Sequence, residues 1–169
     1  MQLGRLEEQT LHRHRQGRLL DKLFADIPGI TSQKCDPRCT RNGQYAYIFH
    51  VNAKEFAGIS TGNFIAALNA EGIPTQASYP PLHELDCFRN GEYRKCLAGA
   101  QATEKHSFLT QKFPHTHRAA WETVWLPQFA LLGDEQDMNE IATAIKKIQR
   151  NAKELAANAS QATAEKVAR

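Results

Sequence analysis

The sequence predicts an α+β fold: a small antiparallel or mixed sheet of three to four strands, with helices mainly on one face and a long helix at the N-terminus. Two observations lead to this prediction. Segments with the three- and four-residue apolar spacing of a helix alternate with short runs of β-forming residues. The length of 169 residues fits one domain. We therefore expect a single domain over residues 1–150 and an Ala-rich helical tail that frays over residues 151–169.

The first element is predicted to be a helix over residues 1–27. Leu3, Leu6, Leu20 and Phe24 recur at helical spacing, and Pro28-Gly29 ends the pattern. No Ser, Thr, Asp or Asn precedes Leu3 as a cap, so the pattern is that of a helix already under way at the first residue. We expect the apolar stripe to pack on the domain or on a second copy of the chain.

The middle of the chain alternates between strand and helix signals. Turn-forming residues over 31–43 predict a loop, and alternation over 44–51 predicts a strand. Ser60 or Thr61 can cap a helix that ends at Gly72. A short strand is then expected over 74–79, Pro80-Pro81 forces an extended turn, and one helical turn is expected over 82–88.

The last third of the chain contains the clearest helix. Residues 92–112 carry no decisive pattern, and Pro114 starts a helix that leads into a short strand at 125–127. Trp121 and Trp125 are expected to pack in the core. Gly133-Asp134 introduces the final helix, whose apolar face is Met138, Ile141, Ala142, Ile145, Ile148 and Leu155.

Composition excludes several classes of function. The longest apolar run, Tyr45 to Phe49, is far shorter than the roughly 20 residues that cross a bilayer, so no membrane partner is expected. The first residues lack the apolar stretch of a secretory signal, which predicts a cytoplasmic location. A net charge of +3 is too small to indicate a nucleic-acid partner. The basic residues 12–15 fit a solvated helix face.

Cysteine and histidine spacing does not predict a metal site. Cys35 and Cys39 form one close pair, but Cys87 and Cys96 are too far apart for a second tight pair of zinc ligands. The cysteines are expected to be thiols in loops or on the surface. His117 shares no helix face with the histidine two residues before it. A zinc or nucleic-acid binding module remains a minor alternative.

An ordered series of short motifs carries a more specific signal. These motifs include Arg41-Asn42 with Tyr45, Phe56-x-Gly58-Ile59-Ser60, Glu71-Gly72-Ile73-Pro74, Tyr79-Pro80-Pro81-Leu82-His83, Trp125-Leu126-Pro127 and Leu131-Leu132-Gly133. Over about residues 2–150 the series resembles the C-terminal part of the DegT/DnrJ/StrS family. Members of that family are pyridoxal-phosphate aminotransferases that act on sugars and cyclitols.

The resemblance implies the small domain of a fold-type-I aminotransferase, preceded by the helix that joins it to the large domain. In the family, the lysine that holds pyridoxal phosphate, the acid facing the pyridine nitrogen and the phosphate-binding residues all belong to the large domain. No catalytic, cofactor-binding or metal-binding residue of this chain is therefore assigned. Pyridoxal phosphate is expected in complete family members and not in this chain.

The resemblance also implies five candidates for the wall of a substrate cleft. Arg41, Asn42 and Tyr45 precede the first strand, and Tyr79 and His83 lie in the turn after Pro74. Family members that act on nucleotide-linked sugars often carry His immediately before this Tyr, where this chain has Ser78. The difference favours cyclitols or related ketones as substrates. For each candidate residue, a structural role in a turn is an equally good interpretation.

The predicted function is that of a C-terminal small domain which forms part of the substrate cleft and is not catalytic alone. The alternative is a free-standing remnant that acts as an association module. In both cases the apolar surface left by the missing domain favours a homodimer. A separately encoded cofactor domain is a second expected partner.

Overall fold

The computed structural model describes residues 2–90 and 111–158. These residues form two compact units. The first contains residues 2–77 and 122–158, and the second contains residues 78–90 and 111–121. Within the described residues, no helix is both long and apolar enough to cross a membrane.

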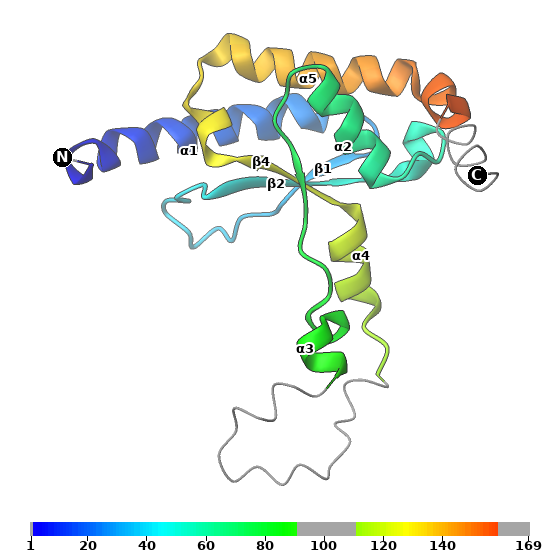
Figure 1. Cartoon of the computed structure of the whole chain (residues 1–169). Helices are drawn as coiled ribbons and strands as arrows, with labels where there is room; N and C mark the ends of the chain where they lie inside the picture. Colours follow the sequence, from blue (N-terminus) through cyan, green and yellow to red (C-terminus); the bar gives the residue numbers. More distant parts are fainter. Residues whose placement is uncertain (1, 91–110, 159–169) are drawn as a thin grey trace, which may run out of the picture. The chain divides into compact units, whose positions relative to one another are not determined.

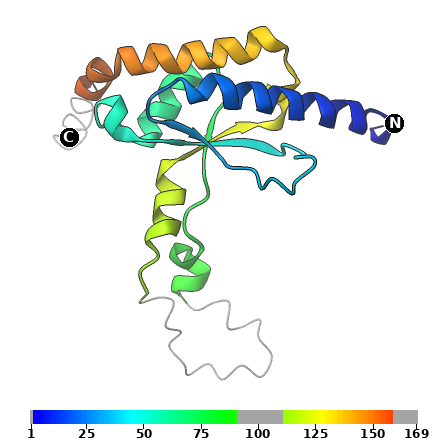
Figure 2. The same ribbon diagram turned by 180° about the vertical axis from the view of Figure 1, so that it is seen from behind.

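The first unit is an antiparallel sheet with helices on one face (Figure 1). Its strands lie in the order β1-β2-β4-β3. The same arrangement is visible from behind in Figure 2. The elements are α1 (Leu3–Ala25), β1 (Ile30–Ser32), β2 (Ala46–Val51), η1 (Ala53–Phe56), α2 (Thr61–Ala70), β3 (Gln76–Ala77), β4 (Thr123–Pro127), η5 (Gln128–Leu132) and α5 (Glu135–Arg150). The predicted α+β fold and the long N-terminal helix are confirmed.

Strand β2 organises the sheet because it pairs on both sides. Ile30 of β1 lies opposite Val51, and Trp125 of β4 lies opposite Ile48. Tyr47, Phe49 and Val51 alternate with less buried residues and are buried. One face of β2 therefore forms part of the core.

Edge-to-face aromatic pairs fill the centre of this core. The Phe49 ring lies 5.1 Å from the Phe24 ring of α1 and 6.4 Å from the Phe64 ring of α2. Phe56 lies 5.2 Å from Phe64 at an interplanar angle of 85°. In this geometry the positive edge of one ring faces the negative face of the other. Such pairs stabilise the fold by more than the burial of their apolar surface alone.

Helix α1 is buried only in its second half. Leu20 and Phe24 are buried, but Leu3 is 84% exposed and Leu6 is 49% exposed. Periodicity therefore predicted the helix correctly. Leu20 and Phe24 pack on the domain, whereas Leu3 and Leu6 do not, and their packing on a second copy stays a prediction. Gly29, with φ of +84°, turns the chain into β1 after the helix ends.

Two further details differ from the sequence predictions. Strand β1 lies in the segment read as a loop, because a three-residue strand is too short to show alternation. Trp121, expected in the core, is 62% exposed.

The final helix begins where predicted: the Asp134 carboxylate accepts hydrogen bonds from the backbone N–H groups of Gln136 and Asp137 at the N-terminus of α5. Residues 152–158 are helical, and the rest of the predicted tail lies outside the described residues.

The second unit contains η2 (Leu82–Glu84), α3 (Asp86–Arg89) and all of α4 (Pro114–Glu122) except its last residue, Glu122, which belongs to the first unit. The helical turn predicted over 82–88 and the helix predicted at Pro114 are both present. Most of the undecided segment 92–112 lies outside the described residues.

Candidate functional site

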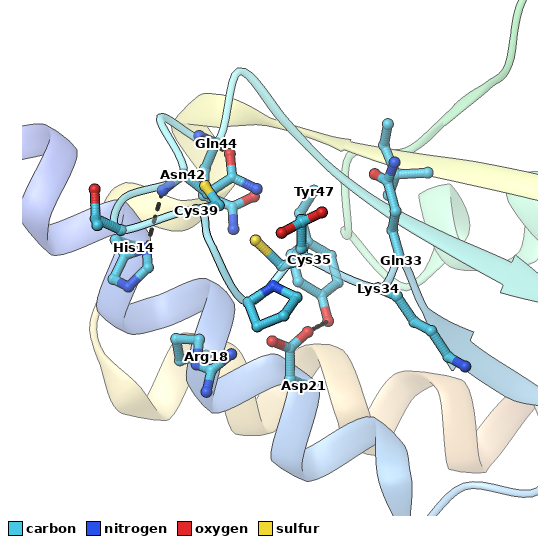
Figure 3. Close-up of a pocket in the computed structure, with 14 residues that line it drawn as sticks. His14, Arg18, Asp21, Gln33, Lys34, Cys35, Cys39, Asn42, Gln44 and Tyr47 are labelled. Carbon is cyan, nitrogen blue, oxygen red and sulfur yellow. Dashed lines mark hydrogen bonds between the residues drawn. The ribbon is translucent and has the colours of Figure 1, made fainter.

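A polar cavity of about 520 Å³ lies between α1 and the loop that joins β1 to β2 (Figure 3). It is lined by His14, Arg18, Asp21, Gln33, Lys34, Cys35, Asp36, Pro37, Cys39, Thr40, Asn42, Gln44, Tyr47 and Ile48. Most of these side chains can donate or accept hydrogen bonds. The cavity is therefore suited to a polar ligand.

The phenol of Tyr47 lies at the inner side of this cavity and is fixed by two partners. Its hydroxyl donates to Asp21 Oδ1 over 2.9 Å and also hydrogen-bonds Ser32 Oγ at 2.8 Å (Figure 3 shows the first contact). Burial raises the pKa of Tyr47 far above its ordinary value of 10.0. The hydroxyl is therefore a neutral donor throughout the physiological pH range.

Replacing Tyr47 with Phe should lower the free energy of unfolding by about 1–2 kcal/mol at pH 7, because Asp21 loses a donor. The raised pKa gives a second effect. A tyrosine that holds its proton more tightly when folded contributes stability that is intact below pH 10 and lost as the pH rises further. Urea unfolding of both proteins between pH 7 and 11 should show a steeper loss above pH 10 with Tyr47 present. Parallel curves would contradict this account.

Two thiols line the same cavity. Cys35 and Cys39 are exposed and free, as predicted, and so is Cys87 of the second unit. Two effects raise the pKa of Cys35: the larger is its hydrogen bond with Cys39, and the second is desolvation of the thiol. Cys35 is therefore a poor nucleophile at neutral pH. Cys96 lies outside the described residues.

Charged groups of both signs surround these thiols. Arg18 and Lys34 contribute positive charge, and Asp21 and Asp36 contribute negative charge. The guanidinium of Arg38 holds the pKa of Asp36 below its ordinary value through a bidentate contact, with Nη2 at 2.7 Å from Oδ2. The cavity thus combines a mixed charge with several neutral amides.

Of the three candidates that precede β2, only Asn42 lines the cavity. The side-chain oxygen of Asn42 accepts a hydrogen bond from the backbone N–H of Gln44 at 2.9 Å. The backbone N–H of Asn42 donates to His14 Nδ1 at 3.4 Å. Arg41 pairs with Glu7 of α1 at 2.7 Å, and Tyr45 is 79% exposed. Arg41 and Tyr45 therefore lie outside the cavity lining.

The other two candidates belong to the second unit. Tyr79 is 69% exposed. His83 lies in η2, and its ring centroid is 4.8 Å from that of Phe113 at an interplanar angle of 49°. His83 lines a separate hollow together with Pro80, Glu84, Leu85, Asp86, Arg89 and Gln111. No described cavity contains all five sequence candidates.

Sequence reasoning missed Arg18, Asp21 and Tyr47. Tyr47 lies in the predicted strand 44–51 and Asp21 in the predicted helix 1–27, and neither pattern points to a site. A hydrogen bond between a helix residue and a strand residue far along the chain depends on the tertiary fold. The only available signal was the presence of polar residues on the side of α1 away from its apolar stripe.

This architecture is shared with known aminotransferases. DesI, solved with its TDP-sugar product, superposes with a TM-score of 0.70 at 24% identity, over 94% of this chain and 36% of DesI. The synthase of 3-amino-5-hydroxybenzoic acid superposes with a TM-score of 0.67 at 24% identity, over 87% of this chain and 36% of the synthase. At this identity the likeness establishes the fold alone.

Sequence comparison adds the family. The DegT/DnrJ/EryC1/StrS aminotransferase family model matches residues 1–146, and the chain belongs to this family. An L-glutamine:2-deoxy-scyllo-inosose aminotransferase of Streptoalloteichus tenebrarius is 31% identical over 157 residues, which are 92% of this chain and 37% of the relative. The corresponding enzyme of Streptomyces paromomycinus is 32% identical over 151 residues, which are 89% of this chain and 35% of the relative. The chain thus spans little more than a third of these relatives.

The described residues do not fit the pyridoxal phosphate that the family implies. A lysine that holds this cofactor is usually activated by desolvation or by a neighbouring cation, and a carboxylate must face the pyridine nitrogen. In the described part of the chain the lysines are all exposed: Lys22, Lys34, Lys54, Lys112, Lys146, Lys147 and Lys153. Asp21, the less exposed of the two carboxylates that line the cavity of the first unit, already accepts a hydrogen bond from Tyr47.

Proposed function

We propose that this chain is the C-terminal small-domain part of a pyridoxal-phosphate aminotransferase acting on a sugar or cyclitol. In this proposal it forms part of the substrate cleft and is not catalytic alone. The observation that carries the proposal is the match of the family model to residues 1–146, in a chain that spans only 37% of a curated relative. The order of the family-like motifs supports placing it at the C-terminal end.

The chemistry of the cavity in the first unit supports a polyhydroxylated ligand. A ring that carries several hydroxyls and a ketone needs both donors and acceptors close together. Arg18 supplies donors, Asp21 supplies an acceptor, and Asn42 supplies both. Relatives named as scyllo-inosose aminotransferases, together with Ser78 in place of the His described above, favour a cyclitol ketone.

The remaining sequence candidates are proposed as further cleft residues. The exposed phenol of Tyr79 and the imidazole of His83 can hydrogen-bond hydroxyl groups of a substrate held by the rest of the enzyme. Arg41 and Tyr45, in the loop that precedes β2 of the first unit, are proposed in the same role. Arg41 would have to exchange its exposed ion pair with Glu7 for the substrate, which costs little because surface pairs are weak.

A chimera tests this function. Residues 2–150 would replace the matching third of the Streptoalloteichus tenebrarius enzyme, and amino transfer from L-glutamine to 2-deoxy-scyllo-inosose would be measured. We expect the chimera to be active and His83→Ala to raise its KM, with Lys54→Ala, an exposed residue outside the cavities described, as the control. A chimera that folds and binds pyridoxal phosphate but transfers no amino group would contradict the proposal.

An association module is the second candidate function, and it predicts a homodimer. Leu3, Leu6 and Leu11 are exposed within the first half of α1. Burying them against a second copy would remove this apolar surface from water. Light scattering at increasing concentration should show a dimer that Leu3→Glu with Leu6→Glu converts to a monomer. A monomer at every concentration would contradict self-association.

Two further expectations belong to the same proposal. The free thiols support a reducing, cytoplasmic location. A separate cofactor-domain protein is proposed as a partner, and no nucleic-acid partner is proposed. Co-purification of this chain with a pyridoxal-phosphate-binding protein from its own cells would support the partner.

A further inference from the structure

The second unit brings together two imidazoles and a carboxylate from separate segments. His83 and Glu84 lie in η2, and His117 lies in the first turn of α4. Glu84 Oε1 is 3.4 Å from His117 Nε2 and 4.0 Å from His83 Nε2. One potential ligand atom of each residue lies within 4.8 Å of the others.

This spacing is close to that of a bound divalent ion. Zinc binds imidazole nitrogen and carboxylate oxygen at about 2.0–2.2 Å in a tetrahedron, which places neighbouring ligand atoms about 3.3–3.5 Å apart. The Glu84–His117 distance already has this value. The His83 nitrogen lies farther away, at 4.0 Å from the same Glu84 oxygen, so binding would draw the His83 ring toward the other two ligands.

Backbone hydrogen bonds fix the segments that carry Glu84 and His117, and ring contacts restrict the two imidazoles. The Glu84 amide donates to the Pro81 carbonyl at 2.9 Å, and the His117 amide donates to the Phe113 carbonyl at 3.0 Å. The His83 ring lies 4.8 Å from the Phe113 ring and 5.3 Å from the His117 ring. Less side-chain entropy is therefore lost on binding than for three freely rotating groups.

The cluster is also accessible. The side chain of His83 is 17% exposed, that of Glu84 39% and that of His117 40%. His83 and Glu84 line the hollow described above, which also contains Asp86. An ion can enter from this side and keep water at its remaining coordination position.

We propose that His83, Glu84 and His117 bind one divalent transition-metal ion, of which Zn²⁺ fits the nitrogen and oxygen donors best. The sequence predicted no metal in this chain, since His117 was paired only with His115. Its actual partners lie more than thirty residues earlier in the chain. The site shares His83 with the proposed substrate cleft, but ion binding by this chain alone is measured without any aminotransferase activity, so the two proposals can fail separately.

Calorimetric titration of the chelator-treated full chain with Zn²⁺ tests the site. We expect one ion per chain with an affinity that His117→Ala lowers at least about 100-fold. The isosteric Glu84→Gln should also weaken binding. His115→Ala, an exposed histidine two residues away on the same helix, is the matched control and should bind as the original chain does.

The thiols of Cys35 and Cys39 are the competing ligands, and Co²⁺ distinguishes them. Cobalt on the histidine–glutamate site should give weak visible bands without the intense near-ultraviolet absorption of a thiolate complex. The proposal is overturned if no stoichiometric ion binds. It is equally overturned if His117→Ala and Glu84→Gln both bind as His115→Ala does, or if the cobalt spectrum is that of thiolate ligation.

Discussion

Replacing Phe49 with Ala should lower the free energy of unfolding by about 4 kcal/mol. The Phe49 side chain has no exposed surface and packs edge-to-face on Phe24 and at an angle on Tyr47. Its removal leaves a cavity between β2 and the helices. The loss of stability therefore has two parts: apolar atoms are no longer buried, and the space they filled stays empty. Because domains are typically stable by only 5–15 kcal/mol, the variant should be close to unfolding.

Two variants keep this prediction specific to packing. Phe49→Leu retains most of the apolar volume and should cost about 1.5 kcal/mol. Tyr45→Ala removes an aromatic ring near the start of the same strand, but Tyr45 is 79% exposed, so the change should stay within about 0.5 kcal/mol. Urea unfolding measures all three. Equal losses for Phe49→Ala and Tyr45→Ala would contradict the described core.

Replacing Gly29 with Ala should cost about 3 kcal/mol. Gly29 has a φ of +84°, which is unfavourable for any residue with a Cβ. A Cβ at this position would lie 2.5 Å from Glu55 Cβ and 3.2 Å from Phe56 Cε2. The turn cannot move away easily, because the Gly29 carbonyl accepts from the Asn52 amide at 2.8 Å.

Variants at two other glycines distinguish the cost of backbone strain from the cost of a steric clash of the added Cβ. Gly72 has the same φ of +84°, but a Cβ there would meet nothing within 4 Å, so Gly72→Ala should cost only about 1 kcal/mol. Gly43 also has open space around it, without the positive φ, and Gly43→Ala should be nearly neutral. Thermal unfolding would rank the three variants. A Gly29→Ala loss no larger than that of Gly72→Ala would show that the turn does not pack on η1 as described.

Periodicity predicted the main elements because burial of one face imposes a spacing on the sequence. Leu20 and Phe24 in α1, and the alternating residues of β2, are examples. The same periodicity could not tell that Leu3 and Leu6 would be exposed, since exposure depends on what lies against that end of the helix. A three-residue edge strand such as β1 has too few residues to show a period.

The candidate site was predictable only where the chain itself brings residues together. Asn42 and its loop neighbours follow one another, so their proximity could be read from the sequence. The contact between Asp21 and Tyr47 joins a helix to a strand, and the cluster of His83 with His117 joins a turn to a later helix. Both depend on tertiary contacts that no local spacing encodes.

The most direct test of the central claim is a titration of the isolated 169-residue chain with pyridoxal phosphate, followed by absorbance. We expect no saturable one-to-one imine, because the lysines of the described residues are exposed and Asp21, which lines the cavity of the first unit, already accepts a hydrogen bond from Tyr47. Slow, scattered labelling of several surface lysines is the expected background. A stable one-to-one imine band that disappears when a single lysine is changed to arginine would contradict the account, since the chain would then carry its own cofactor site.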